Sequence, residues 1–342
     1  MSDSAPTNVD PALVEMMNAV FADHRAHHPA TTRVERDPRL WQHLDELGLV
    51  RLTGAEQSGG SGAGWFEAAE LLAAAARHAV RIPLGEHDLL ACWLLEANQM
   101  PADTAVRTVC LLDDDGSASG VPWAAGSDRI VVVWRDGDNH RAADVDVAAL
   151  EITRGANLIG EPRDTVAADV TGVDGVPVAA DLVARFRMKA ALIRAIQVCA
   201  VLDQIVALSI YHAGARVQFG RSLSRFQAVQ HQVADLAAEA ALARAATESA
   251  LTTAVASDWT AANLHFRIAA ARSCAGHAAS VVVRNAHQVH GAIGTTREHR
   301  LHEYTRAALA WRSEFGSVRY WDEQVTDAAL AAGADVWSLI TD

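Results

Sequence analysis

The sequence predicts an α+β fold that is mainly helical, with a helical, a β and a second helical domain over residues 1–104, 105–178 and 179–342. Two observations support this. In the first and last thirds apolar residues recur every three or four positions, which is typical of helices packed on a core. Between Val106 and Val178 short apolar runs alternate with turn-forming clusters, which is typical of strands. We expect the last domain to be an antiparallel four-helix bundle.

The first domain is predicted to consist of several short helices. Residues 11–50 hold two helical patterns, the second of which carries Trp41, Leu44 and Leu47 and ends at Gly48. Further helices are expected over 65–78 and 89–95, the latter closing the domain near Pro101.

A glycine-rich stretch, Gln57–Gly64, precedes the helix that begins at Trp65. A Walker phosphate loop requires Lys followed by Ser or Thr after its last glycine, whereas Trp65 and Phe66 follow here. The stretch is therefore interpreted as a flexible connection.

The middle domain is predicted from three apolar runs, over residues 109–112, 129–134 and 148–152. Asp-Gly, Gly-Ser-Asp and Gly-Asp-Asn clusters separate them, as expected of turns between strands.

The last domain contains two long helical patterns that meet at a corner. The first runs over Leu182–His212, and the second starts at Phe226. We expect Gly220 to end the first helix and Ser222 or Ser224 to cap the second. Arg216 at such a corner is free to bind a phosphate through its forked guanidinium, although a surface arginine beside a phenylalanine is the simpler interpretation. Further helices are predicted over 281–290, 301–311 and 318–337.

Composition excludes several classes of function. The 342 residues carry a net charge of −13, which argues against a nucleic-acid-binding surface. The polar, acidic start and the lack of an unbroken run of eighteen apolar residues predict a cytoplasmic protein without a membrane span. The scattered cysteines, without C-x-x-C spacing, are interpreted as buried thiols: Cys92, Cys110, Cys199 and Cys274.

Two histidine pairs, His287 with His290 and His299 with His302, raise the alternative of a metal site. A di-metal carboxylate bundle requires E-x-x-H on two helices, and none surrounds Glu239 or Glu248. We therefore predict no metal and interpret the histidines as solvated side chains at a helix end.

Two motifs together resemble the C-terminal domain of the acyl-CoA dehydrogenase family. They are R-x-Q-F-G…F-Q at residues 216–227 and Q-x-H-G-x-x-G…E-H at residues 288–299. The α-β-α order of domains agrees with that family, and Glu56–Gly62 is similar to its E-x-x-G-G-x-G stretch. In the family a T-E-P…G-S-D segment lines the flavin ring and the substrate. This chain retains only the second half, Gly126-Ser127-Asp128, and has Val121-Pro122-Trp123 in place of the first half.

The resemblance implies FAD as the cofactor. Arg and Gly in these motifs suit a pyrophosphate and Phe suits an adenine. In the family these positions bind the ADP half of an FAD held mainly by the neighbouring subunit, and Ala292 replaces the usual second glycine. The residues implied to bind it are Arg216, Gln218, Phe219, Phe226, Gln227, Gln288 and Gly291.

The catalytic base is the weak point of the resemblance. Most of the family removes the substrate α-proton with a Glu that lies 27 residues beyond the motif Gln, and that position here is Phe315 (288 + 27). Some members use an acid that lies 26 residues before the motif Arg, and that position here is Ala190 (216 − 26). Glu314 is the one candidate base, displaced by one residue and thus by about 100° if the backbone is helical.

Three interpretations remain open. The favoured one is the non-catalytic subunit of a heterotetrameric acyl-CoA dehydrogenase resembling the actinobacterial α2β2 enzymes that shorten steroid side chains. It implies a second such subunit as partner, an acyl-CoA substrate and an acceptor like electron-transfer flavoprotein. The alternatives are a self-sufficient, self-associating dehydrogenase that uses Glu314, and a helical scaffold without flavin.

Overall fold

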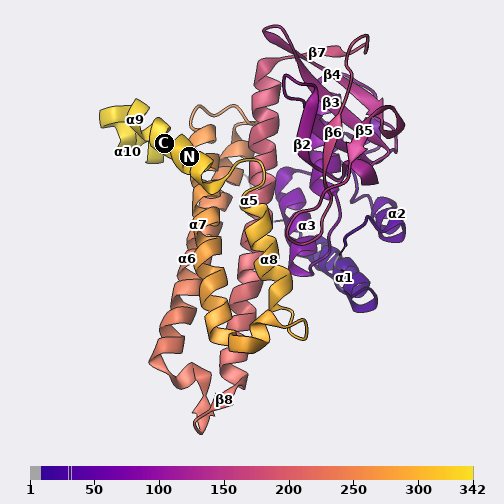
Figure 1. The fold of residues 1–342 in the computed structure, drawn as a ribbon. Coiled ribbons are helices and arrows are strands. Elements are labelled where there is room, and N and C mark those ends of the chain that lie inside the picture. Colours follow the sequence, from indigo (N-terminus) through magenta and orange to yellow (C-terminus); the bar gives the residue numbers. More distant parts are fainter. Residues whose placement is uncertain (1–8, 30, 32, 342) are drawn as a thin grey trace. The chain divides into compact units, whose positions relative to one another are not determined.

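The computed structural model describes residues 9–29, 31 and 33–341 (Figure 1). They form a mainly helical α+β structure, as the sequence predicts. Chain contacts divide it into two compact units, residues 9–190 and the residues from Ala191 onward. The predicted helical and β domains both fall within the first unit.

The helices of the first unit begin where the sequence supplies N-caps. Asp10 caps α1 (Pro11–His27) and Asp37 caps α2 (Pro38–Glu46). A proline follows each cap, at the first helical position, where a backbone N–H would have no partner within the helix and proline has none to lose. The remaining helices are α3 (Trp65–Arg77), the π-helix η2 (Gly85–Cys92) and α4 (Trp93–Ala97). Met17, Phe21 and Leu44 are fully buried.

The glycine-rich stretch is a hydrogen-bonded loop and not a free connection. Backbone N–H groups of Ser61 and Ala63 donate to the carbonyls of Arg51 and Leu52, both at 3.0 Å. A Cβ at Gly60 would lie 2.1 Å from the carbonyl oxygen of Gly54, so glycine is needed here for close backbone approach. Because these N–H groups are used internally, the loop is not built to hold a phosphate.

Two small sheets form the β part of the first unit. One has the order β1-β3-β4-β7, with β1 and β3 parallel and the other pairs antiparallel; the second has the order β2-β6-β5 and is antiparallel. Ile130 and Val132 of β3 and Val166 of β6 belong to a hydrophobic core that the two sheets share. The bounds are β1 Arg107–Leu111, β2 Ser117–Pro122, β3 Arg129–Asp136, β4 Asn139–Asp146, β5 Glu151–Thr153, β6 Arg163–Ala167 and β7 Val176–Val178.

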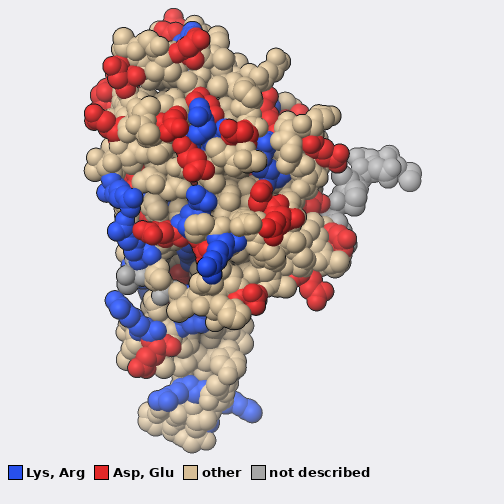
Figure 2. All heavy atoms as spheres, turned by 90° about the vertical axis from the view of Figure 1, so that its right-hand side faces the viewer, with Lys and Arg blue, Asp and Glu red and all other residues tan. Residues whose placement is uncertain are grey.

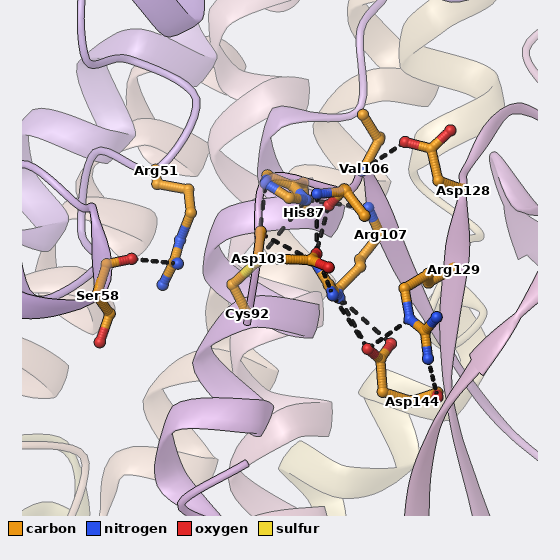
Figure 3. A network of polar contacts seen from close by, with 11 residues as sticks. Arg51, Ser58, His87, Cys92, Asp103, Val106, Arg107, Asp128, Arg129 and Asp144 are labelled. Atoms are coloured by element: carbon orange, nitrogen blue, oxygen red, sulfur yellow. Dashed lines mark hydrogen bonds and ion pairs between the residues drawn. The ribbon is translucent and has the colours of Figure 1, made fainter. Parts of the chain in front are cut away.

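A buried polar network joins η2 to the larger sheet (Figure 3). Arg107, 1% exposed, donates to the Asp144 carboxylate at 3.0–3.2 Å, and Arg129 donates to the same carboxylate at 2.7 Å. His87 is also 1% exposed, and its Nδ1 accepts the backbone N–H of Arg107 at 3.0 Å. Burial and the charges of Arg51, Arg107 and Arg36 lower the pKa of His87 to about 3.

This histidine should make the protein acid-sensitive. Since the unfolded chain binds a proton at its ordinary pKa of 6.5 and the folded chain does not, the stability present above pH 6.5 is lost as the pH falls from 6.5 toward 3. From pH 7.5 to 5.5 the loss from His87 is about 1.4 kcal/mol. Glutamine keeps a hydrogen-bond acceptor but cannot be protonated. In His87→Gln the free energy of unfolding by urea should therefore fall less steeply between pH 7.5 and 5.5 than in the wild type. Equal slopes in both proteins would contradict this assignment.

The second unit is helical throughout. It holds the end of α5 (Ala180–Ala215), α6 (Gln227–Ala256), α7 (Leu264–His290), α8 (Leu301–Trp311), α9 (Val318–Ala332) and α10 (Val336–Thr341). The predicted helix over 281–290 is thus the end of a longer one, and the one predicted over 318–337 breaks at Gly333, whose φ is +55°.

The helices α5, α6, α7 and α8 run side by side (Figure 1) and are joined by side-chain contacts. Cys199 of α5 contacts Thr247 of α6, and His287 of α7 contacts Thr305 of α8. Cys92, Cys110 and Cys199 are buried thiols, as expected, whereas Cys274 is only half-buried.

Among the described residues, α5 is the one helix long and apolar enough to cross a membrane by length and composition. An 18-residue window has a mean hydropathy of 1.8, and 67% of it is buried inside the protein. A buried core helix meets the same criteria, and Arg194 and Asp203 interrupt its apolar sequence.

Candidate functional site

The corner between α5 and α6 is a tight hairpin. The helix ends at Ala215, β8 (Val217–Gln218) pairs with β9 (Arg221–Ser222), and Phe219 and Gly220 form the turn with φ of +52° and +77°. The predicted roles of Gly220 as helix stop and of the serines as caps are therefore wrong. Ser222 and Ser224 share a hydrogen bond of 2.8 Å, and α6 begins after Phe226 without a side-chain cap.

The hairpin presents aromatic and basic groups to solvent. Phe219 is 91% exposed and lies edge-on to the half-buried Phe226, with ring centroids 6.2 Å apart. The Arg221 guanidinium lies over the Phe226 ring at 4.1 Å. Arg216, Gln218 and Gln227 are also exposed.

The local charge is opposite to that of the whole chain. Arg216, Arg221 and Arg225 lie in a stretch, residues 204–234, that contains no acidic residue. Figure 2 shows basic side chains at the lower tip of the molecule, the end at which β8 lies in Figure 1. No described residue forms an ion pair or side-chain hydrogen bond with Arg216, so its guanidinium is available to an anion.

The second motif forms the end of α7. Gln288 and Gly291 are exposed, and Gly291 ends the helix with a φ of +62°, where an added Cβ would meet nothing within 4 Å. Gly294 is buried in the following 3₁₀ turn, η6 (Gly291–Thr295), and a Cβ there would lie 2.8 Å from that of His290. Ala292 is exposed, so its methyl group does not crowd the protein interior.

The two motifs are brought together by packing between α5 and α7. The ring of His212, four residues before Arg216, stacks on that of His290 with centroids 4.5 Å apart. The interpretation of the histidines as solvated is therefore wrong for His290, which is 5% exposed, and His287 is half-buried.

This end of the bundle fits the ADP half of a dinucleotide. It combines an unpaired guanidinium, an exposed phenylalanine ring and a glycine backbone open to close approach. The assignment of Arg216, Gln218, Phe219, Phe226, Gln227, Gln288 and Gly291 to such a ligand stays a prediction, and their exposure is compatible with a ligand shared with another subunit.

The segment that resembles a flavin-ring site is built for packing. Val121, Pro122 and Trp123 are buried where hydroxyl and acidic side chains are expected, and Trp123 has a φ of +59°. Ser127 is buried and donates to the Trp123 carbonyl at 2.9 Å, while Asp128 accepts the Val106 N–H at 2.8 Å.

Trp123, Ser127 and Asp128 border a cavity of about 790 Å³ within the first unit. Arg33, Arg36 and Arg154 contribute to its walls together with Trp123, Ser127 and Asp128. The cavity wall thus carries guanidinium groups, and the Asp128 carboxylate of the G-S-D tail already accepts a backbone hydrogen bond.

Glu314 is held in a buried ion pair. Arg194 of α5, 1% exposed, donates from Nε to Glu314 Oε2 at 2.7 Å, and the Arg194 guanidinium lies over the Phe315 ring at 5.2 Å. Arg272, fully buried, donates from Nη2 to the Arg312, Glu314 and Gly316 carbonyls at 3.0, 2.7 and 3.3 Å. Phe315 and Gly316 have φ of +53° and +115°.

This arrangement opposes a role for Glu314 as a free base. Its Oε2 accepts a hydrogen bond from Arg194 and is directed at that guanidinium. Ala190, the other position considered, is a fully buried alanine. The arginines were not expected from the sequence, because Arg194 interrupts an apolar helix and lies 120 residues from its partner.

Comparisons with known proteins agree with this architecture. Residues 174–326 match the family model described as acyl-CoA dehydrogenase, C-terminal domain. The chain is 30% identical over 310 residues to acyl-CoA dehydrogenase IpdE2 of Mycobacterium tuberculosis (strain ATCC 25618 / H37Rv), covering 86% of this chain and 89% of that relative.

Solved structures show the same fold. The ChsE4-ChsE5 complex from Mycobacterium tuberculosis matches with a TM-score of 0.82 at 20% identity, covering 96% of this chain and 99% of that one. The Tcur3481-Tcur3483 steroid ACAD matches with a TM-score of 0.81 at 22% identity, covering 94% and 98%.

Proposed function

The chain belongs to the acyl-CoA dehydrogenase family, and from this premise we propose that it is the non-catalytic subunit of an FAD-dependent heteromeric enzyme. The observation that carries the proposal is the contrast between two sites. The ADP-type corner is exposed, basic and unpaired at Arg216, whereas Glu314, the one acid near the family's base position, is committed to Arg194.

In this proposal the chain supplies binding and not proton transfer. Bound FAD would accept the hydride in the α,β-dehydrogenation of an acyl-CoA thioester. Arg216 would pair with a pyrophosphate oxygen, the Gly291 backbone would permit close approach of the phosphates, and Phe219 would cover the adenine. The partner subunit would supply the residues that face the flavin ring and the base.

The neighbouring structures support a heteromeric assembly. One is a complex of ChsE4 and ChsE5, and the other, Tcur3481-Tcur3483, is described as a steroid ACAD. We propose by likeness that this chain pairs with a second acyl-CoA dehydrogenase subunit, that the substrate is a CoA thioester of a steroid side chain, and that an electron-transfer flavoprotein-like protein accepts the electrons.

The test is to compare flavin content with and without a partner. We expect the purified chain alone to carry little FAD and to gain it stoichiometrically when co-expressed with an acyl-CoA dehydrogenase subunit from the same genome. The matched control is that partner expressed alone, which should retain less FAD than the complex. A monodisperse monomer of this chain with full FAD occupancy would refute the proposal in favour of a self-sufficient enzyme.

A further inference from the structure

Three imidazoles from separate segments converge at the end of the bundle. His212 lies in the last turns of α5, His290 ends α7, and His299 lies between η6 and α8. One ring nitrogen of each lies within 4.8 Å of the other two. The centroid separations are 4.5 Å for His212 and His290, 4.7 Å for His290 and His299, and 6.1 Å for His212 and His299.

His290 has a buried nitrogen with no protein partner. Its Nδ1 lies 2.8 Å from the Ala286 carbonyl, which can only accept, so Nδ1 carries the hydrogen and Nε2 carries the lone pair. That Nε2 is buried and, among the described residues, has no hydrogen-bond partner. A buried polar atom without a partner is costly, which points to a ligand at this position.

The bonding of His290 is that of a metal ligand. Metal-binding histidines usually donate the hydrogen of the other ring nitrogen to a carbonyl or carboxylate, which fixes the tautomer and aims the lone pair at the ion. Coordination requires each imidazole in its neutral form, with a ring nitrogen lone pair directed at the ion.

We propose that His212, His290 and His299 bind a divalent transition-metal ion of the zinc class. Imidazole suits Zn²⁺, Cu²⁺ and Ni²⁺, whereas Mg²⁺ and Ca²⁺ require oxygen ligands. Three histidines leave one position of a tetrahedral zinc site open to a water molecule or an anion. The ion would link the end of α5, the end of α7 and the segment before α8.

Binding requires a modest closure of the cluster. Ligand nitrogens in a tetrahedral zinc site lie about 3.3 Å apart, so the separations must shrink by up to about 1.5 Å. The Nδ1 of His299 accepts the Leu301 N–H at 3.1 Å, so coordination through Nε2 requires this hydrogen bond to break and the ring to take its other tautomer. His212 and His299 are half-buried, so both rings have room to move.

A second group, His24, His28 and Asp37, has similar spacing but a weaker case. Asp37 is used as the cap of α2, His28 is exposed, and none of the three has a buried atom without a hydrogen-bond partner. It serves as the competing site in the test.

The experiment is a Zn²⁺ titration of the full-length, tag-free chain at pH 7.5 by calorimetry, with Co²⁺ absorption as a second measurement. We expect one tight site per chain and Co²⁺ bands of tetrahedral nitrogen coordination without a thiolate band. His290→Gln and His212→Gln should each weaken Zn²⁺ binding at least tenfold.

Two control variants separate the proposed site from the rest of the chain. His302→Gln removes a neighbouring imidazole outside the cluster, and the double variant His24→Gln/His28→Gln removes the competing site; both should bind Zn²⁺ as the wild type does. Circular dichroism confirms folding, and His212→Gln is the decisive variant if His290→Gln unfolds. Unchanged affinity in a folded His212→Gln chain, loss of binding in either control, or no tight site in the wild type would overturn the proposal.

Discussion

Replacing Glu314 by glutamine is expected to destabilise the protein while leaving catalysis by the assembled complex almost unchanged. The exchange removes the negative charge that faces Arg194, which is 1% exposed. Breaking one partner of a buried ion pair typically costs about 3–5 kcal/mol, because the remaining charge stays buried without compensation. A loss of that size should lower the apparent Tm by roughly 6–20 °C for a unit of this size.

A second buried cation increases the expected cost. Burial and the charge of Arg194 lower the pKa of Arg272 to about 9, and the charge of Glu314 opposes this shift. Its Nη1 and Nε are buried with no hydrogen-bond partner among the described residues. Without the Glu314 carboxylate, two guanidinium groups would share the interior with one acid fewer.

The matched control is Glu323→Gln. Glu323 pairs with Arg319 at 2.8 Å on the surface of α9, where both side chains are largely exposed. Exposed pairs of this kind contribute little to stability because solvent screens them, so this variant should be nearly as stable as the wild type. A double variant, Arg194→Gln/Glu314→Gln, should regain part of the stability lost by Glu314→Gln, because it also removes the buried charge that the Glu314 carboxylate balanced.

The activity measurement separates structure from catalysis. Turnover of acyl-CoA by the complex, assayed below the variant's unfolding temperature, should stay within about a factor of three, whereas loss of a general base removes about 10²–10⁴. A hundredfold loss in a folded Glu314→Gln complex would identify Glu314 as the base and this chain as a catalytic subunit.

Local sequence patterns predicted much of the helical structure and less of the sheets. The periodicity of Leu182–His212 predicted α5 because apolar residues recur at every turn of a buried helix. Strand β4 was missed because Asn139–Asp146 contains few apolar residues and so lacks the alternating pattern of a strand. Its place in the sheet depends on pairing with β3. The Phe219-Gly220 turn was misread because glycine both ends helices and forms hairpin turns.

Contacts between distant segments account for most of what the sequence did not predict. His212 was not singled out, because only the packing of α5 on α7 places its ring against His290. The same holds for Arg194, whose pairing with Glu314 is invisible from the spacing of either residue. The residues assigned to the ADP half of FAD came from motifs, and they remain to be tested by substitution.

Arg216→Ala is expected to weaken FAD binding by the complex about 10- to 150-fold without unfolding it, corresponding to about 1.5–3 kcal/mol for a lost charge-assisted hydrogen bond. Arg216 is exposed and no described residue pairs with it, so its removal leaves no buried group uncompensated. Arg216→Lys should also bind FAD more weakly than the wild type, because an ammonium cannot make the two parallel hydrogen bonds of a guanidinium to phosphate.

The control for this prediction is an arginine outside the motif. Arg187 is an exposed arginine of α5, 29 residues earlier in the sequence, and Arg187→Ala removes the same charge from a site without the motif. The measurement is the FAD dissociation constant of each complex from flavin fluorescence, repeated at two salt concentrations. A phosphate contact predicts that salt weakens FAD binding more in the wild type than in Arg216→Ala. Equal FAD affinity in the wild type, Arg216→Ala and Arg216→Lys would show that this corner does not bind the cofactor, and the ADP half would have to lie elsewhere.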